Sequence, residues 1–117
     1  MALKEIYDLV FDSSVNAGAT DAQLSGIVPI GKTVRLLNFG GFDPLSSDQV
    51  SSIISIQWGS AAGWSTIRAG GNGVFDIVFD KGKDFTGDGV KRFRLIRQNK
   101  SSIGKVLVVW ASALIIN

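Results

Sequence analysis

The sequence predicts an all-β fold: an antiparallel β-sandwich, jelly-roll-like, with seven to eight strands in a single domain over residues 1–117. Two observations predict it. Short apolar stretches alternate with a period of two, and turn-forming residues separate them. The chain also holds 14 Gly against 2 Pro, and in a β protein glycine serves turns and bulges. Eight short strands with no convincing helical stripe favour a jelly roll.

The first two apolar stretches are irregular. Residues 3–11 fit either a helical stripe or a strand, and the β-rich run into Asp12 favours a strand. Residues 24–30 contain Pro29, which cannot donate to a β-ladder. We therefore expect an edge strand or the entry to a strand there.

Alternation is clearer further along the chain. Residues 33–39 change phase between Leu36 and Leu37, which one extra residue in a strand, a β-bulge, explains. Further strands are predicted at residues 50–58, 64–68, 75–79 and 90–98. The shared period predicts a core of Val50, Ile54, Ile56, Trp58, Phe75, Ile77, Phe79, Phe93, Leu95, Val108 and Trp110.

The last strand, residues 106–116, is apolar on both faces. A strand of this kind is buried on both sides, so something must cover its second face. With Val108 and Trp110 assigned to the core, the opposite face is the expected oligomer interface. It consists of Leu107, Val109, Ala113 and Ile115. Closed symmetry would cover these residues and prevent open-ended aggregation.

The composition argues against an enzyme. There is no His, no Cys and a single Glu, so the usual carriers of acid–base, nucleophilic and transition-metal chemistry are missing. We expect no catalytic residue, no cofactor and no metal. A net charge of +2 argues against nucleic acid. A membrane partner is not expected either, because no stretch approaches the ~20 apolar residues of a span. The first residues lack a signal-peptide layout, which predicts synthesis in the cytoplasm.

Four aspartates at a spacing of four residues invite comparison with a calcium loop. They are Asp76, Asp80, Asp84 and Asp88. Calcium binds six to eight oxygen atoms, often closed by a carboxylate twelve positions into the loop. Counted from Asp84, that position is Leu95, inside a predicted strand. The alternative, a solvent-facing strand that ends in a hairpin turn, is favoured.

Basic residues gather near the last hairpin. They are Arg92, Arg94, Arg97, Lys100 and Lys105. Such a group could meet phosphate or an acidic protein surface. A stacking platform for single-stranded nucleic acid would need aromatic rings on the same face, and Phe93 points the other way. A solvated strand face, balanced by the acidic hairpin, is the favoured interpretation.

Trp64 is the candidate ligand platform. Trp58 and Trp110 are in phase with aliphatic residues and are assigned to the core, whereas Trp64 stands beside Gly63 and Ser65 at a strand entry. An exposed tryptophan there could stack on a sugar ring.

Two stretches of the chain resemble small jelly-roll virion proteins of tailed bacteriophages. Gly26-Ile27-Val28-Pro29-Ile30-Gly31-Lys32-Thr33-Val34-Arg35-Leu36 is similar to a strand entry of that family. Phe85-Thr86-Gly87-Asp88-Gly89-Val90-Lys91-Arg92-Phe93-Arg94-Leu95 is similar to a Gly-Asp-Gly loop followed by a basic, alternating strand. Gln98-Asn99-Lys100-Ser101-Ser102 then precedes Gly104 and the last apolar strand. The resemblance covers residues 24–39 and 85–116.

The resemblance implies a structural protein of a virion. Capsid decoration is the expected role, with the chain assembling as a homo-oligomer, a trimer by the resemblance, on a capsid or other virion protein. The alternative is a fibre head that binds a receptor, or a carbohydrate-binding β-sandwich module. The expected location is the virion, after synthesis in the host cytoplasm. The motifs are turns and strands, and no functional residue is transferred through them.

Overall fold

The computed structural model describes residues 6–11, 13–43, 53–70, 73–100 and 104–116. In these ranges all regular structure is β-strand. Eight longer strands are accompanied by the two-residue strands β2 and β9. The strands are β1 (Ile6–Phe11), β2 (Ser14–Val15), β3 (Thr20–Leu24), β4 (Thr33–Asp43), β5 (Ile53–Ser60), β6 (Gly63–Gly70), β7 (Gly73–Thr86), β8 (Arg92–Gln98), β9 (Lys105–Val106) and β10 (Val108–Ile115).

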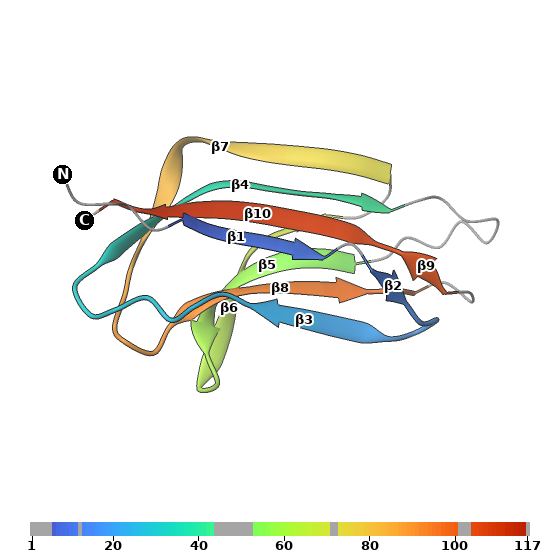
Figure 1. The fold of residues 1–117 in the computed structure, drawn as a ribbon, viewed down its shortest axis with the longest axis horizontal. Helices are drawn as coiled ribbons and strands as arrows, with labels where there is room; N and C mark the ends of the chain where they lie inside the picture. Colours follow the sequence, from blue (N-terminus) through green and yellow to red (C-terminus); the bar gives the residue numbers. More distant parts are fainter. Residues whose placement is uncertain (1–5, 12, 44–52, 71–72, 101–103, 117) are drawn as a thin grey trace.

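The eight longer strands form two antiparallel four-stranded sheets that pack face to face (Figure 1). The first sheet has the order β1-β10-β4-β7, and the second has the order β3-β8-β5-β6. The chain passes from one sheet to the other after β1, β3, β4, β6, β7 and β8, so the strands wind around the core as in a jelly roll. The expected all-β sandwich is confirmed.

The core lies between the sheets and is largely the one that alternation predicts. Ile54, Ile56, Phe93 and Leu95 are buried. Trp58, Ile77 and Phe79 are partly buried and pack against them. The remaining buried members of the cluster are Val28, Val34, Leu36, Phe39, Val109, Ala111 and Ala113. Val50 and the side chain of Phe75 lie outside the described part of the chain.

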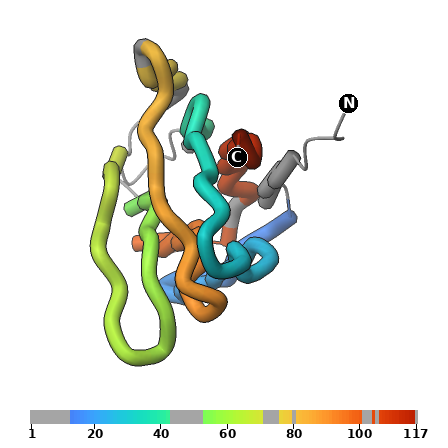
Figure 2. Tube along the Cα trace, turned by 90° about the vertical axis from the view of Figure 1, so that its left-hand side faces the viewer, coloured from blue at the N-terminus to red at the C-terminus, as the bar shows by residue number. Residues whose placement is uncertain are grey.

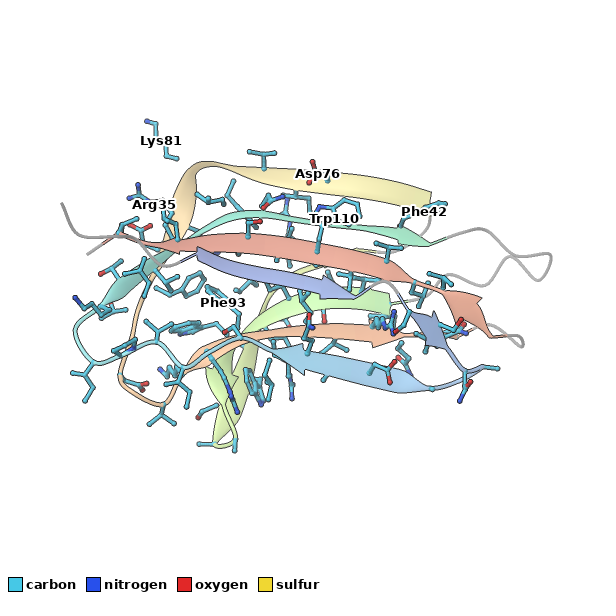
Figure 3. The ribbon with its side chains drawn as sticks, in the orientation of Figure 1. Arg35, Phe42, Asp76, Lys81, Phe93 and Trp110 are labelled. Carbon is cyan, nitrogen blue, oxygen red and sulfur yellow. The ribbon has the colours of Figure 1, made fainter. Side chains whose placement is uncertain are left out.

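Three aromatic rings join the two sheets. The ring centroids of Trp58 (β5) and Phe93 (β8) lie 4.9 Å apart, and Phe85 (β7) lies 5.0 Å from Trp58 and 5.4 Å from Phe93. β7 reaches this position because it bends at Lys81 and Gly82, both with positive φ, before its last residues pair again with β4. Figure 3 shows Phe93 between the layers.

The strand pairings confirm two expectations and correct one. Residues 6–11 form a strand, and β4 carries the expected irregularity, since its register shifts between Leu36 and Asn38 on pairing with β7. The edge strand expected at residues 24–30 is wrong, and the alternative, the entry to a strand, holds, because these residues lead into β4. The strand is β3, Thr20–Leu24, and the residues that follow form a loop.

The last strand has the opposite phase from the one expected. Leu107, Val109 and Ala113 are buried in the interior of this chain, and Ile115 packs against the core. Val108 and Trp110 lie on the outer side of the sheet and are only partly covered. When both faces of a strand are apolar, alternation cannot tell which one is inside. Here the smaller side chains fill the sandwich, and the indole ring of Trp110 lies outside.

The expectation that Arg97 belongs to a solvated strand face is also wrong. Its side chain is 1% exposed and shares the inner face of β8 with Phe93 and Leu95. Its Nη1 donates to the carbonyl oxygens of Ser13 and Leu107 at 2.7 and 2.6 Å. Its Nη2 donates to Ser13 Oγ at 2.8 Å and to the carboxylate of Asp21 at 3.2 Å.

We predict that Phe93→Ala lowers the free energy of unfolding by about 3–5 kcal/mol, because it removes a buried ring and leaves a cavity between two aromatic neighbours. Urea denaturation measures the change. Val78→Ala is the matched control, since this side chain is exposed and its truncation should change the free energy of unfolding by less than about 0.5 kcal/mol. Equal effects of the two substitutions would contradict the assignment of the core.

Candidate functional site

The most distinctive surface is the outer face of the first sheet, where apolar side chains from three strands lie together. Trp110 (β10) stands directly opposite Gly40 (β4), and Gly40 stands opposite Asp76 (β7). A Cβ at Gly40 would lie 2.6 Å from the indole ring, so the ring occupies the space above the glycine. Its Nε1 donates to Asp76 Oδ1 at 3.4 Å (Figure 3).

Two exposed apolar residues extend this surface. Phe42, opposite Val108 in the register, is 43% exposed, and Val78, two residues after Asp76, is 71% exposed. We call Phe42, Val78, Val108 and Trp110 the apolar sheet face. The residues of the expected oligomer interface, Leu107, Val109, Ala113 and Ile115, lie on β10 or beside it, but on the inner side or against the core.

The sequence carries a partial signal for this face. Ile77 and Phe79 are partly buried, so alternation alone places Asp76 and Val78 on the outside. An exposed Val in that position is readable from the pattern. The position of Trp110 cannot be read from the sequence, because both faces of β10 are apolar. Phe42 of β4 joins the same face only through its pairing with Val108 of β10.

Trp64, the candidate ligand platform, lies on the outer face of the second sheet and is partly buried. The Arg94 guanidinium carbon is 4.1 Å from the centroid of its ring. Arg94 Nε also donates to Gln57 Oε1 at 2.7 Å, and its Nη2 donates to the same oxygen. Since β5 lies between β6 and β8, the ring reaches across β5, where the residue opposite Trp64 is Gly59. One ring face is therefore occupied by a cation from the protein itself.

The acidic residues have partners within the chain. Arg35 binds both oxygens of Asp84, at 2.8 and 3.1 Å, and this hydrogen bonding holds the pKa of Asp84 below its usual value. Asp88 Oδ1 accepts from the backbone N–H groups of Lys91 and Val90, which lowers the pKa of Asp88. Asp76 is exposed on the sheet face. In the described ranges, no three His, Cys, Asp or Glu side chains gather where they could hold a metal ion.

The basic residues do not form one surface. Arg92 and Arg94 share the outer face of β8, whereas Arg97 is inside. Lys100 is exposed beyond the end of the strand, and the side chain of Lys105 lies outside the described part. Among the described residues, no helix has the length and apolar character needed to cross a membrane.

Comparison with known proteins gives likeness to solved structures. No protein-family model and no curated protein matches the chain. Among solved structures, the crystal structure of PirA is similar over 92% of this chain and 93% of that one, at 16% sequence identity and a TM-score of 0.42.

We predict that Gly59→Ala destabilises the protein by about 1–3 kcal/mol, because its new Cβ would lie 2.2 Å from the carbonyl oxygen of Gly63 and backbone would have to move. Gly63→Ala, in the same hairpin, is the control, since a Cβ there meets nothing within 4 Å. Thermal denaturation of the two variants measures the difference. A Gly59→Ala protein as stable as the Gly63→Ala protein would contradict the pairing of β5 with β6.

Proposed function

We propose that the chain is a non-enzymatic virion structural protein, a capsid decoration protein that assembles as a homo-oligomer on a larger protein shell. The observation that carries the proposal is the apolar sheet face. Phe42 and Val78 are exposed on the same outer sheet face as the Trp110 ring, and a partner could cover them.

The composition of this face fits a protein partner. Protein interfaces are enriched in aromatic residues at their centres, and here Trp110 and Phe42 occupy neighbouring strands. Asp76 accepts the indole N–H, so a polar atom at the centre of the face already has a partner. A contact between copies of the chain, closed by symmetry, would cover the face without open-ended growth.

The jelly-roll winding and the resemblance of residues 24–39 and 85–116 to phage virion proteins give the proposal its specific form. This part is an analogy at the level of the fold. The absence of His and Cys and the single Glu support a role without catalysis. Three-fold symmetry rests on the resemblance alone.

We predict that the purified chain is an oligomer at micromolar concentration by light scattering, and that Val78→Asp or Phe42→Asp converts it to a folded monomer. The reason is that a charge would be desolvated in an apolar contact without a partner. Ile30→Asp is the control: Ile30 is 79% exposed, more than Val78 or Phe42, but lies away from this face, so the variant should remain an oligomer. In virions whose genome encodes the chain, immunogold labelling should then mark the outside of the heads.

A monomeric unmodified chain would contradict the oligomer. Virions whose heads carry no label would contradict the decoration role even if the oligomer forms. Retained oligomers in both sheet-face variants would show that the contact lies elsewhere on the molecule.

A further inference from the structure

A second group of exposed apolar residues lies at one end of the sandwich, on two loops. Residues 25–32 connect β3 to β4, and residues 87–91 connect β7 to β8. Ile30 is 79% exposed, Val90 56% and Ile27 45%. We call these three residues the aliphatic tip.

The two loops are fastened to each other by backbone hydrogen bonds. Gly89 N–H donates to the carbonyl of Val28 at 3.1 Å, Val28 N–H to that of Lys91 at 3.0 Å, and Gly87 N–H to that of Lys32 at 2.7 Å. Figures 1 and 2 show the two loops side by side at the same end of the molecule, in cyan and orange. The exposed side chains are therefore held on a preformed support.

Side chains fix the loops to the sandwich as well. Val28 follows the exposed Ile27 and precedes Pro29 and the exposed Ile30. Its side chain is fully buried, so it anchors the first loop in the core. A Cβ at Gly87 would lie 2.4 Å from the carbonyl oxygen of Pro29, which means that the loops approach too closely for any other residue. A Cβ at Gly89 would lie 3.0 Å from Ile30 Cγ1, so the two loops also meet beside the exposed isoleucine.

The charges around the tip are mainly positive. The charged residues of the two loops and of the first position of β8 are Lys32, Lys91 and Arg92 against Asp88, which gives +3 − 1 = +2. Lys32 and Lys91 are exposed. The carboxylate of Asp88 accepts from two backbone N–H groups of its own loop, where it shapes the turn.

The composition of the tip differs from that of the apolar sheet face in a way that separates their partners. Protein interfaces favour aromatic residues and Arg at their centres and are depleted in Lys. The tip has aliphatic side chains on a convex end, with two lysines beside them. Aliphatic side chains partition into the acyl boundary of a bilayer, while neighbouring lysines attract anionic headgroups and keep their ammonium groups in water.

We propose that the aliphatic tip inserts into the surface of a membrane that contains anionic phospholipids. The expectation of no membrane partner rests on the absence of an apolar stretch long enough to span a bilayer. A peripheral contact needs no spanning segment, so the two statements do not conflict. The contact is also independent of the proposed function, because it uses different residues at a different place on the fold.

The test is co-sedimentation of the full chain with vesicles of phosphatidylcholine containing about one-third phosphatidylserine, and with vesicles of phosphatidylcholine alone. We expect binding to the mixed vesicles that weakens as salt is raised. The double variant Ile30→Asn, Val90→Asn should bind at least about tenfold more weakly, since two aliphatic side chains no longer enter the bilayer. Lys32→Gln with Lys91→Gln should lower binding to the mixed vesicles toward that on phosphatidylcholine alone.

Ile53→Asn is the matched control, because it replaces an exposed aliphatic side chain at the start of β5, on the second sheet and outside both the aliphatic tip and the apolar sheet face. It should bind vesicles like the unmodified chain, and every variant should keep the melting temperature of the unmodified chain. Asparagine avoids a change of charge that would itself alter binding to anionic lipid. The proposal is overturned if the unmodified chain does not sediment with mixed vesicles, or if the tip variant binds as well as Ile53→Asn. It is also overturned if the tip variant loses self-association and keeps vesicle binding, which would make the tip a protein contact.

Discussion

The buried guanidinium of Arg97 is the polar interaction that connects the largest number of separate segments at one end of the sandwich. A buried guanidinium is tolerated only where hydrogen bonds and an opposite charge compensate for the loss of water. Arg97, on β8, obtains them from Asp21 of β3, from Ser13 between β1 and β2, and from Leu107 beside β10. One side chain therefore links a central strand of the second sheet to both ends of the chain.

The residues around Arg97 reinforce this arrangement. Asn99 Nδ2 donates to the carbonyl of Val15 at 3.0 Å, and Asn99 N–H donates to that of Ala19 at 3.0 Å. At the other end of the sandwich, the Trp58–Phe85–Phe93 contacts hold the sheets together through aromatic packing. With one end polar and the other aromatic, the core between them is filled by aliphatic side chains and Phe39.

This filling leaves two of the three tryptophans, Trp64 and Trp110, on outer faces, and Gly40 makes room for the ring of Trp110. Trp110 lies over Gly40 and reaches Asp76, and Trp64 reaches across β5 at the level of Gly59 to meet Arg94. The outcomes differ. Trp64 is engaged by a cation of the protein itself, whereas Trp110 lies beside exposed Phe42 and Val78 and becomes part of a surface suited to a partner.

Sequence reasoning succeeded where one face of a strand is polar. β5 and β8 were predictable because Ile54, Ile56, Phe93 and Leu95 alternate with polar residues. Alternation also places Arg97 inward with Phe93 and Leu95, so its burial was readable, but the partners that permit it come from distant segments. β3 was missed because its two apolar residues, Ala22 and Leu24, lie on its exposed face, while its partly covered face carries Asp21 and Gln23, and because it pairs with β8 through its backbone.

The candidate surfaces were harder to predict, for physical reasons. In β10 both faces are apolar, and only the three-dimensional fit between Trp110 and Gly40 decides which face points outward. The aliphatic tip needs two loops that are 55 or more residues apart to meet, from residues 25–32 to residues 87–91. A single sequence contains Ile30 and Val90 but not their proximity.

The phase of β10 decides whether the apolar sheet face exists. Because the chain has no Cys, the exposure of each β10 side chain can be measured directly by introducing single cysteines. Single cysteines can be placed at Val108, Val109, Ala113 and Leu114 of the monomeric Val78→Asp protein, in which no second copy covers the apolar sheet face, and exposed to a charged thiol reagent in the native protein and in urea. We expect Val108→Cys and Leu114→Cys to react readily in the native protein, and Val109→Cys and Ala113→Cys to react only after unfolding. Rapid native labelling of Val109→Cys and Ala113→Cys, with protection at Val108 and Leu114, would show that β10 has the opposite phase and that the apolar sheet face does not exist.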